Sequence, residues 1–237
     1  MQFTPKLRKV LFQKRYKRFL TDVTQDDGST LTVHCPNTGS MKHCLAPNTD
    51  CWISESNNPK RKYPNTLEIV TTPTGHKAGI NTSRANALVA EAIDRGIITE
   101  LSHYQTVKPE AKSPIDNSRM DFLLSDHPSD HRACFVEVKN VTLLEEDGRG
   151  YFPDSVSERG SKHLQVLTEL LNHNYRTALL FCVQHSGINT VSPADHIEPR
   201  YGQLLREAHK AGVEILAYRA TLSAEEIRID QAIPVVL

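Results

Sequence analysis

The residues whose types and spacing point most directly to chemistry are Asp121, Glu137 and Lys139. Asp121 begins one short apolar run, Glu137 and Lys139 lie in the next, and the polar loop 125–133 separates the two runs, which is typical of a β-hairpin. The antiparallel register set by that loop brings Asp121 opposite Glu137. Because side chains alternate along a strand, Glu137 and Lys139 then share one face. The pattern therefore predicts two carboxylates and one ammonium group close together.

Two opposed carboxylates repel each other on a sheet unless something offsets the repulsion. A divalent cation would do so, since Mg²⁺ takes oxygen ligands from one or two carboxylates and keeps its other positions for water and phosphate. In this interpretation Asp121 and Glu137 hold Mg²⁺ or Mn²⁺, and Lys139 orients or deprotonates a water or stabilises the transition state. The alternative is an ordinary surface hairpin that carries charges of both signs.

The composition is that of an ordinary globular protein. The chain has 237 residues, of which 38% are hydrophobic and 24% are charged, which suits one or two domains. It has no apolar run of membrane-spanning length, no signal peptide, and five cysteines without a C-x-x-C pair. We therefore expect a cytoplasmic protein in a reducing environment, without a membrane partner.

Charge is distributed unevenly along the chain. Residues 1–80 hold 12 Lys and Arg against 6 Asp and Glu, although the whole chain has no net charge. Cations alternate with aromatic residues at 14–19 and again at 60–63, as expected of a groove that follows phosphates and stacks bases. The candidate DNA-binding residues there are Arg15, Lys17, Arg18, Lys60, Arg61 and Lys62. A solvated basic face is the alternative, and for the rings of Tyr16 and Phe19 we favour burial in a core over stacking.

The N-terminal third predicts strands and no helix. Four short runs with partial alternation are separated by turn residues, and they lie at 19–23, 31–34, 51–54 and 66–70. Several strands without intervening helices suggest a small barrel, of which the oligonucleotide-binding (OB) type is one possibility. The turn at 35–40 adds backbone N–H groups, an amide and hydroxyls, so Asn37 and Thr38 are candidates for phosphate contacts.

The remaining residues predict alternating helices and strands. Buried strands are expected at 177–183 and 213–218, with a helix at 201–211 between them. This alternation predicts an α/β domain with a central mixed sheet. The boundary between the two domains is expected between Thr72 and Asn81, where proline and glycine residues gather.

Two further helices carry candidate site residues. One starts at Ser83 and carries an apolar stripe, with Glu91 at its edge, where the carboxylate could reach either a site or solvent. The other is expected to start near Ser161, with Lys162 and His163 in its first turn. Cations there oppose the helix dipole, so a neighbouring phosphate would explain them; two tolerated surface side chains are the alternative.

Six segments together resemble the bacterial sugar fermentation stimulation protein family, in order and across nearly the whole chain. They are Arg15–Phe19, His34–Gly39, Ser118–Phe122, Glu137–Leu143, Gly150–Asp154 and Glu158–Leu164. The resemblance implies an N-terminal OB-type β-barrel (1–80) and a C-terminal PD-(D/E)XK nuclease-like α/β domain (81–237). It also implies DNA binding and an association with the activation of maltose and other sugar metabolism genes. In the nuclease pattern, Glu91 would join Asp121, Glu137 and Lys139 as a catalytic residue and further metal ligand.

Two functions are consistent with these features. In the first, the protein binds DNA with little sequence discrimination, regulates sugar metabolism, and keeps the nuclease-like metal site as a feature of its scaffold. In the second, it is an active Mg²⁺- or Mn²⁺-dependent DNA endonuclease that uses Asp121, Glu137 and Lys139. The chain has no helix-turn-helix or zinc-finger signature, which disfavours a strictly sequence-specific repressor.

Overall fold

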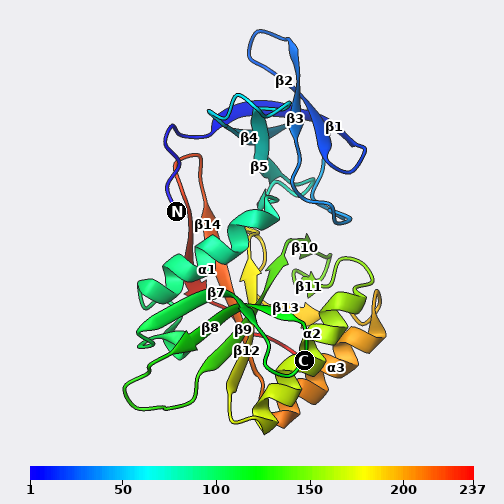
Figure 1. Ribbon diagram of the computed structural model, residues 1–237. Coiled ribbons are helices and arrows are strands. Elements are labelled where there is room, and N and C mark those ends of the chain that lie inside the picture. Colours follow the sequence, from blue (N-terminus) through cyan, green and yellow to red (C-terminus); the bar gives the residue numbers. More distant parts are fainter.

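The computed structural model describes residues 1–237, and its N-terminal part is a small closed β-barrel (Figure 1). Five strands run in the order β3-β2-β1-β4-β5, and a parallel pairing of β3 with β5 closes the barrel. A short strand, β6, extends this sheet beyond β5. The strands are β1 (Arg8–Tyr16), β2 (Leu20–Thr24), β3 (Thr30–His34), β4 (Thr49–Glu55), β5 (Asn65–Thr71) and β6 (Lys77–Gly79). The expected OB-type barrel is confirmed.

One end of the barrel gathers its basic loops. Tyr16 pairs with Leu20 across the β1–β2 turn, Leu20 pairs with His34, and His34 pairs with Thr66 at the start of β5. These successive pairings bring the β1–β2 turn, the loop after His34 and the β4–β5 loop to the same end. In OB folds the β1–β2 and β4–β5 loops are the ones that contact oligonucleotides. The predicted basic segment at 60–63 lies in the β4–β5 loop, and the one at 14–19 covers the end of β1 and the β1–β2 turn.

The C-terminal part is an α/β domain built on a six-stranded mixed sheet. The sheet order is β15-β14-β12-β9-β8-β7, with parallel pairings of β9, β12 and β14 at its centre and antiparallel strands at both edges. The strands are β7 (Thr106–Lys112), β8 (Arg119–Ser125), β9 (Cys134–Val141), β12 (Arg176–Val183), β14 (Glu214–Leu222) and β15 (Ile227–Ala232). Strand β12 is a nearly continuous buried run, as a strand covered on both faces must be.

Helices cover both faces of this sheet (Figure 1). Helix α1 (Ala85–Asp94) packs with Phe122, Val136 and Val138 on one face, whereas α2 (Glu158–Asn172) and α3 (Pro199–Ala211) pack with Phe135 and Phe181 on the other. Three short strands form a small second sheet beside the main one: β10 (Leu143–Leu144), β11 (Gly150–Phe152) and β13 (Val191–Pro193). None of the helices has the length and apolar character needed to span a bilayer.

Two helix starts differ from the sequence prediction. The turn before α1 is capped by Asn81, whose side chain accepts from the Ser83 backbone N–H, so Ser83 is not the cap. Helix α2 begins at Glu158, and its cap is Ser157, whose hydroxyl accepts from the Gly160 N–H. Lys162 and His163 therefore lie in the second turn of α2, where the dipole of the helix end has little effect.

Direct contacts join the two domains. The Asp154 carboxylate accepts hydrogen bonds from the Ser40 hydroxyl at 2.9 Å and the Met41 N–H at 3.3 Å. At a second point Gly79 N–H donates to the Gln184 carbonyl at 2.8 Å, which continues the barrel edge into the α/β domain. The barrel is therefore held to the α/β domain both through a side-chain contact and through its backbone.

Candidate metal and nucleic-acid site

The strands β8 and β9 pair in the register predicted from sequence. Leu124 pairs with Cys134 and Phe122 with Val136, so the next positions, Asp121 and Glu137, face each other where the two strands separate. At this point the Asp121 carboxylate replaces the lost strand pairing, because its Oδ2 accepts from the Val138 N–H at 2.7 Å. Its other oxygen, Oδ1, accepts from Asn86 Nδ2 of helix α1 at 2.8 Å.

Glu137 is buried, with 3% of its surface exposed. Its Oε1 accepts from Lys139 Nζ at 2.6 Å and from His163 Nδ1 at 2.5 Å. Arg159 donates to the other ring nitrogen of His163, so the imidazole is the tautomer whose Nδ1 carries hydrogen. The second oxygen of Glu137, Oε2, is buried and has no hydrogen-bond partner.

The environment shifts the pKa values of the Asp121 and Glu137 carboxyl groups in opposite directions. Burial and the neighbouring charge of Glu137 raise the pKa of Asp121 above its ordinary value. Burial alone would also raise the pKa of Glu137, but the hydrogen bond from His163 and the charge of Lys139 outweigh it, so that pKa lies below its ordinary value. Glu137 is therefore the more readily ionised group, and a further positive charge nearby would favour the ionised form of Asp121.

These residues fit a divalent cation. An unpartnered buried carboxylate oxygen is costly, and a bound cation would satisfy it and offset the repulsion between Asp121 and Glu137. No group of three His, Cys, Asp or Glu side chains is arranged to hold a metal ion. Two carboxylates, with water and phosphate in the other positions, are nevertheless the usual donor set for Mg²⁺.

The structure corrects the prediction for Glu91. Its carboxylate is paired with the amino group of Met1 and with Arg95, not with the residues around Asp121. Glu91 lies five residues after Asn86 on α1, and at 3.6 residues per turn it points well away from the face that contacts Asp121. Asn86 is the residue that α1 supplies. No local pattern indicates Asn86, because a single amide near a helix start is more often an exposed side chain.

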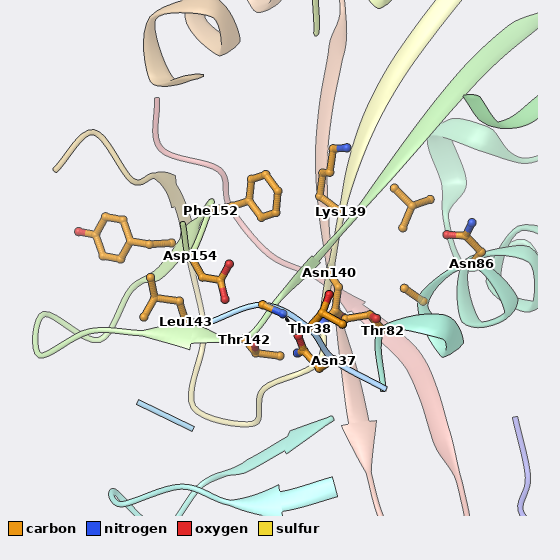
Figure 2. Close-up of a pocket in the computed structure, with 14 residues that line it drawn as sticks. Asn37, Thr38, Thr82, Asn86, Lys139, Asn140, Thr142, Leu143, Phe152 and Asp154 are labelled. Atoms are coloured by element: carbon orange, nitrogen blue, oxygen red, sulfur yellow. Dashed lines mark hydrogen bonds between the residues drawn. The ribbon is translucent and has the colours of Figure 1, made fainter. Parts of the chain in front are cut away.

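A cleft of about 310 Å³ is lined by both domains, and it includes Asn86 and Lys139, the hydrogen-bond partners of Asp121 and Glu137, but neither carboxylate itself. The barrel contributes Asn37 and Thr38, which Figure 2 shows beside Asn140 and Asp154 of the α/β domain. Lys139 and Asn86 line the same cleft, and Asn86 donates to Asp121 as described above. The predicted phosphate-contacting turn and the predicted catalytic lysine therefore share one cavity.

The predicted basic residues divide into two groups. Arg15 has a structural role, since its guanidinium donates hydrogen bonds to the backbone carbonyls of Arg18, Asn37 and Gly39. The other cations take part in no ion pair, in contrast to the strand lysine Lys14, which pairs with Asp22. They lie in the β1–β2 turn and the β4–β5 loop and comprise Lys17, Arg18, Lys60, Arg61 and Lys62.

The aromatic residues of the first basic segment do not lie in the barrel core. Tyr16 is half-buried and its hydroxyl donates to the Asp22 carboxylate at 3.0 Å. Phe19 is 45% exposed, because the inward position of β2 is taken by Leu20. The expectation that both rings belong to the core was therefore wrong, most clearly for Phe19.

The α2 cations are not arranged as predicted either. Lys162 forms an ion pair with Asp116 at 3.2 Å, and the His163 ring is buried against Glu137. Neither side chain is directed at a phosphate from a helix terminus, because α2 starts earlier than expected. His163 is instead part of the carboxylate cluster, which the sequence did not reveal because 26 residues separate it from Glu137.

Comparison of the whole chain with known proteins identifies one family. The family model described as "Sugar fermentation stimulation protein RE domain" matches residues 83–226, and the "SfsA N-terminal OB domain" matches residues 14–80. A sugar fermentation stimulation protein homolog from Teredinibacter turnerae is 56% identical, with 100% of both chains covered. One from Shewanella sp. (strain MR-7) is 52% identical, with 99% of each covered. The structure of Pyrococcus furiosus SfsA in complex with Ca²⁺ has a TM-score of 0.86 and 25% identity, and the match covers 100% of this chain and 98% of that one.

Proposed function

The chain belongs to the sugar fermentation stimulation protein family, and the hydrogen-bond partners of its carboxylate pair, Asn86 and Lys139, line a cleft shared by both domains. We propose that it binds DNA and hydrolyses it with a divalent cation. The observation that carries the proposal is that Glu137 Oε2 is buried without a hydrogen-bond partner, in a carboxylate whose charge raises the pKa of Asp121. A buried carboxylate oxygen without a hydrogen-bond partner lowers the stability of the protein. If Glu137 had no function, replacing it would remove this cost without loss.

Asp121 and Glu137 are the residues that would hold the cation, and the related Pyrococcus furiosus protein in complex with Ca²⁺ supports a site of this type. When bound, the cation would neutralise charge on the scissile phosphate and lower the pKa of a bound water. Mg²⁺ and Mn²⁺ suit the same oxygen donors, so either is expected to support the reaction.

The protein's own side chains would perform the remaining tasks. Lys139, held 2.6 Å from Glu137 and lining the cleft, places a positive charge beside the bound phosphate. Asn86 and His163 fix the two carboxylates through hydrogen bonds. The Asn37 and Thr38 side chains would position the DNA backbone from the barrel side of the cleft.

DNA binding itself is supported by the unpaired cations of the two barrel loops. Because phosphate contacts carry no sequence information, this surface favours binding with little sequence discrimination. We propose that any effect on maltose or other sugar metabolism genes comes from such binding.

The test is cleavage of supercoiled plasmid and single-stranded DNA with Mg²⁺ or Mn²⁺, using Asp121→Ala and Glu137→Ala. Both variants should lose cleavage, whereas Glu91→Gln should keep it, since Glu91 lies outside the site. Cleavage that survives both alanine substitutions, or no cleavage by the unmodified protein in either metal, would refute hydrolysis. DNA binding would then be tested separately, through the salt dependence of affinity in Lys17→Ala/Arg18→Ala.

A further inference from the structure

The β1–β2 turn has an unusual backbone and an exposed aromatic ring. Lys17 and Arg18 have φ values of 49° and 64°, in the left-handed region that non-glycine residues seldom adopt. Arg15 Nε holds this conformation by donating to the Arg18 carbonyl at 2.9 Å. Phe19 follows directly and is 45% exposed. The turn thus holds two cations without ion pairs, Lys17 and Arg18, next to the exposed Phe19 ring. Glycine would adopt the backbone conformation of Lys17 and Arg18 with less strain.

This turn is fixed to the wall of the cleft. The Arg15 guanidinium that supports it also donates to the Asn37 carbonyl at 2.8 Å and the Gly39 carbonyl at 3.1 Å. Asn37 and Gly39 line the cleft together with Lys139. The Arg15 side chain therefore joins the turn before Phe19 to residues that line the cleft.

A second combination of cation and ring lies at the same end of the barrel. Lys62 Nζ lies 5.6 Å from the centre of the Tyr63 ring, and both residues line a hollow with His34 and Arg61. His34 pairs with Leu20, the residue after Phe19, so the hollow and the turn belong to one surface. Rings and cations thus accompany each other on both basic loops.

We propose that this surface selects single-stranded DNA, with an unpaired base stacked on Phe19 and its phosphates on Lys17 and Arg18. In a duplex the base faces are covered by neighbouring bases, so exposed rings contribute little, and cations alone would suffice to hold the phosphates. An unpaired base offers its face to an aromatic side chain, whatever its sequence. The proposal rests on the DNA binding proposed above and adds the form of DNA that the protein prefers.

The test is fluorescence anisotropy with a labelled strand of about 12 nucleotides, within the usual site size of an OB fold, and with the same sequence as a hairpin duplex. Both are measured in EDTA, so that binding is separated from cleavage. The unmodified protein should bind the single strand more tightly. Phe19→Ala should weaken single-strand binding about tenfold while duplex binding changes less than about twofold. Phe19→Tyr, which keeps the ring, should bind the single strand almost as the unmodified protein does.

Lys17→Ala is the matched control, because it removes a charge from the same turn and should weaken binding to both forms. The proposal is overturned if Phe19→Ala affects both forms equally or neither, or if the unmodified protein prefers the duplex. Because Phe19 is exposed, its variants are expected to fold, which their melting temperatures would verify. A protein that prefers single strands but never cuts DNA would refute the proposed hydrolysis and leave this inference intact.

Discussion

His163 should be required both for stability and for cation binding, although it does not lie in the cleft. The ring is 4% exposed and donates from Nδ1 to a carboxylate that is itself buried. A hydrogen bond to a charged group contributes about 1.5–3 kcal/mol. In a domain of this size each kcal/mol corresponds to about 2–4 °C in melting temperature, so His163→Ala should lower Tm by roughly 3–12 °C.

The same substitution should weaken cation binding. Without the imidazole, only Lys139 holds Glu137, so the carboxylate can rotate and Oε2 is no longer fixed next to Asp121. Loss of such a supporting hydrogen bond typically reduces metal affinity about 10–100-fold. Isothermal titration with Ca²⁺ measures the effect without any cleavage.

A matched pair of variants separates the hydrogen bond from the volume of the ring. His163→Asn places an amide N–H near the position of Nδ1 and should recover part of the Ca²⁺ affinity, whereas His163→Gln places its amide near Nε2 and should not. Wild-type Ca²⁺ affinity in His163→Ala, or equal affinities in the Asn and Gln variants, would refute the positioning role.

Two further predictions concern pH and the domain junction. Because the pKa of Asp121 is raised, its contribution to the stability of the metal-free protein is present below pH 3.8 and is lost as pH rises through the folded pKa. Ca²⁺ would offset that loss, so the increase in Tm caused by Ca²⁺ should grow as the pH rises from about 4 to neutral, and an increase that does not change with pH would count against Asp121 as a ligand. Arg84→Met should destabilise the protein by about 3–5 kcal/mol in urea denaturation, since it leaves the fully buried Glu68 carboxylate without its ion-pair partner, with hydrogen bonds from Ser54 and Asn81 only. Adding Glu68→Gln should restore part of the loss; if it restores nothing, the uncompensated charge is not the cause.

The parts of the fold that follow from periodicity were predictable. The buried strand β12 and the apolar stripe of α1 were recognised because packing on the sheet imposes a hydrophobic pattern on each. Strand β7 was not, since it is an edge strand that is mostly exposed and contains Pro109, so it shows little alternation. Strand β1 was not predicted, and only its end, at 14–16, fell within the segment interpreted as a binding surface.

The site was predictable only where its residues lie on neighbouring strands. The spacing within one hairpin sufficed to bring Asp121 opposite Glu137 and to place Lys139 on the same face. Asn86 and His163 come from helices on opposite faces of the sheet, and their approach depends on tertiary packing that no local pattern encodes. An error of three residues in the start of α2 was enough to assign His163 to phosphate instead of to Glu137.

The contacts between barrel and α/β domain would affect the products of the proposed cleavage. The Asp154 contact and the hydrogen bond from Gly79 to Gln184 fix the barrel in place, so its basic end stands at a constant offset from Asp121 and Glu137. In the proposed reaction, DNA would be bound at one place and cut at a fixed distance from it. Fragments released from a long strand would then share a preferred minimum length, set by the distance between the place of binding and the carboxylates and not by the base sequence.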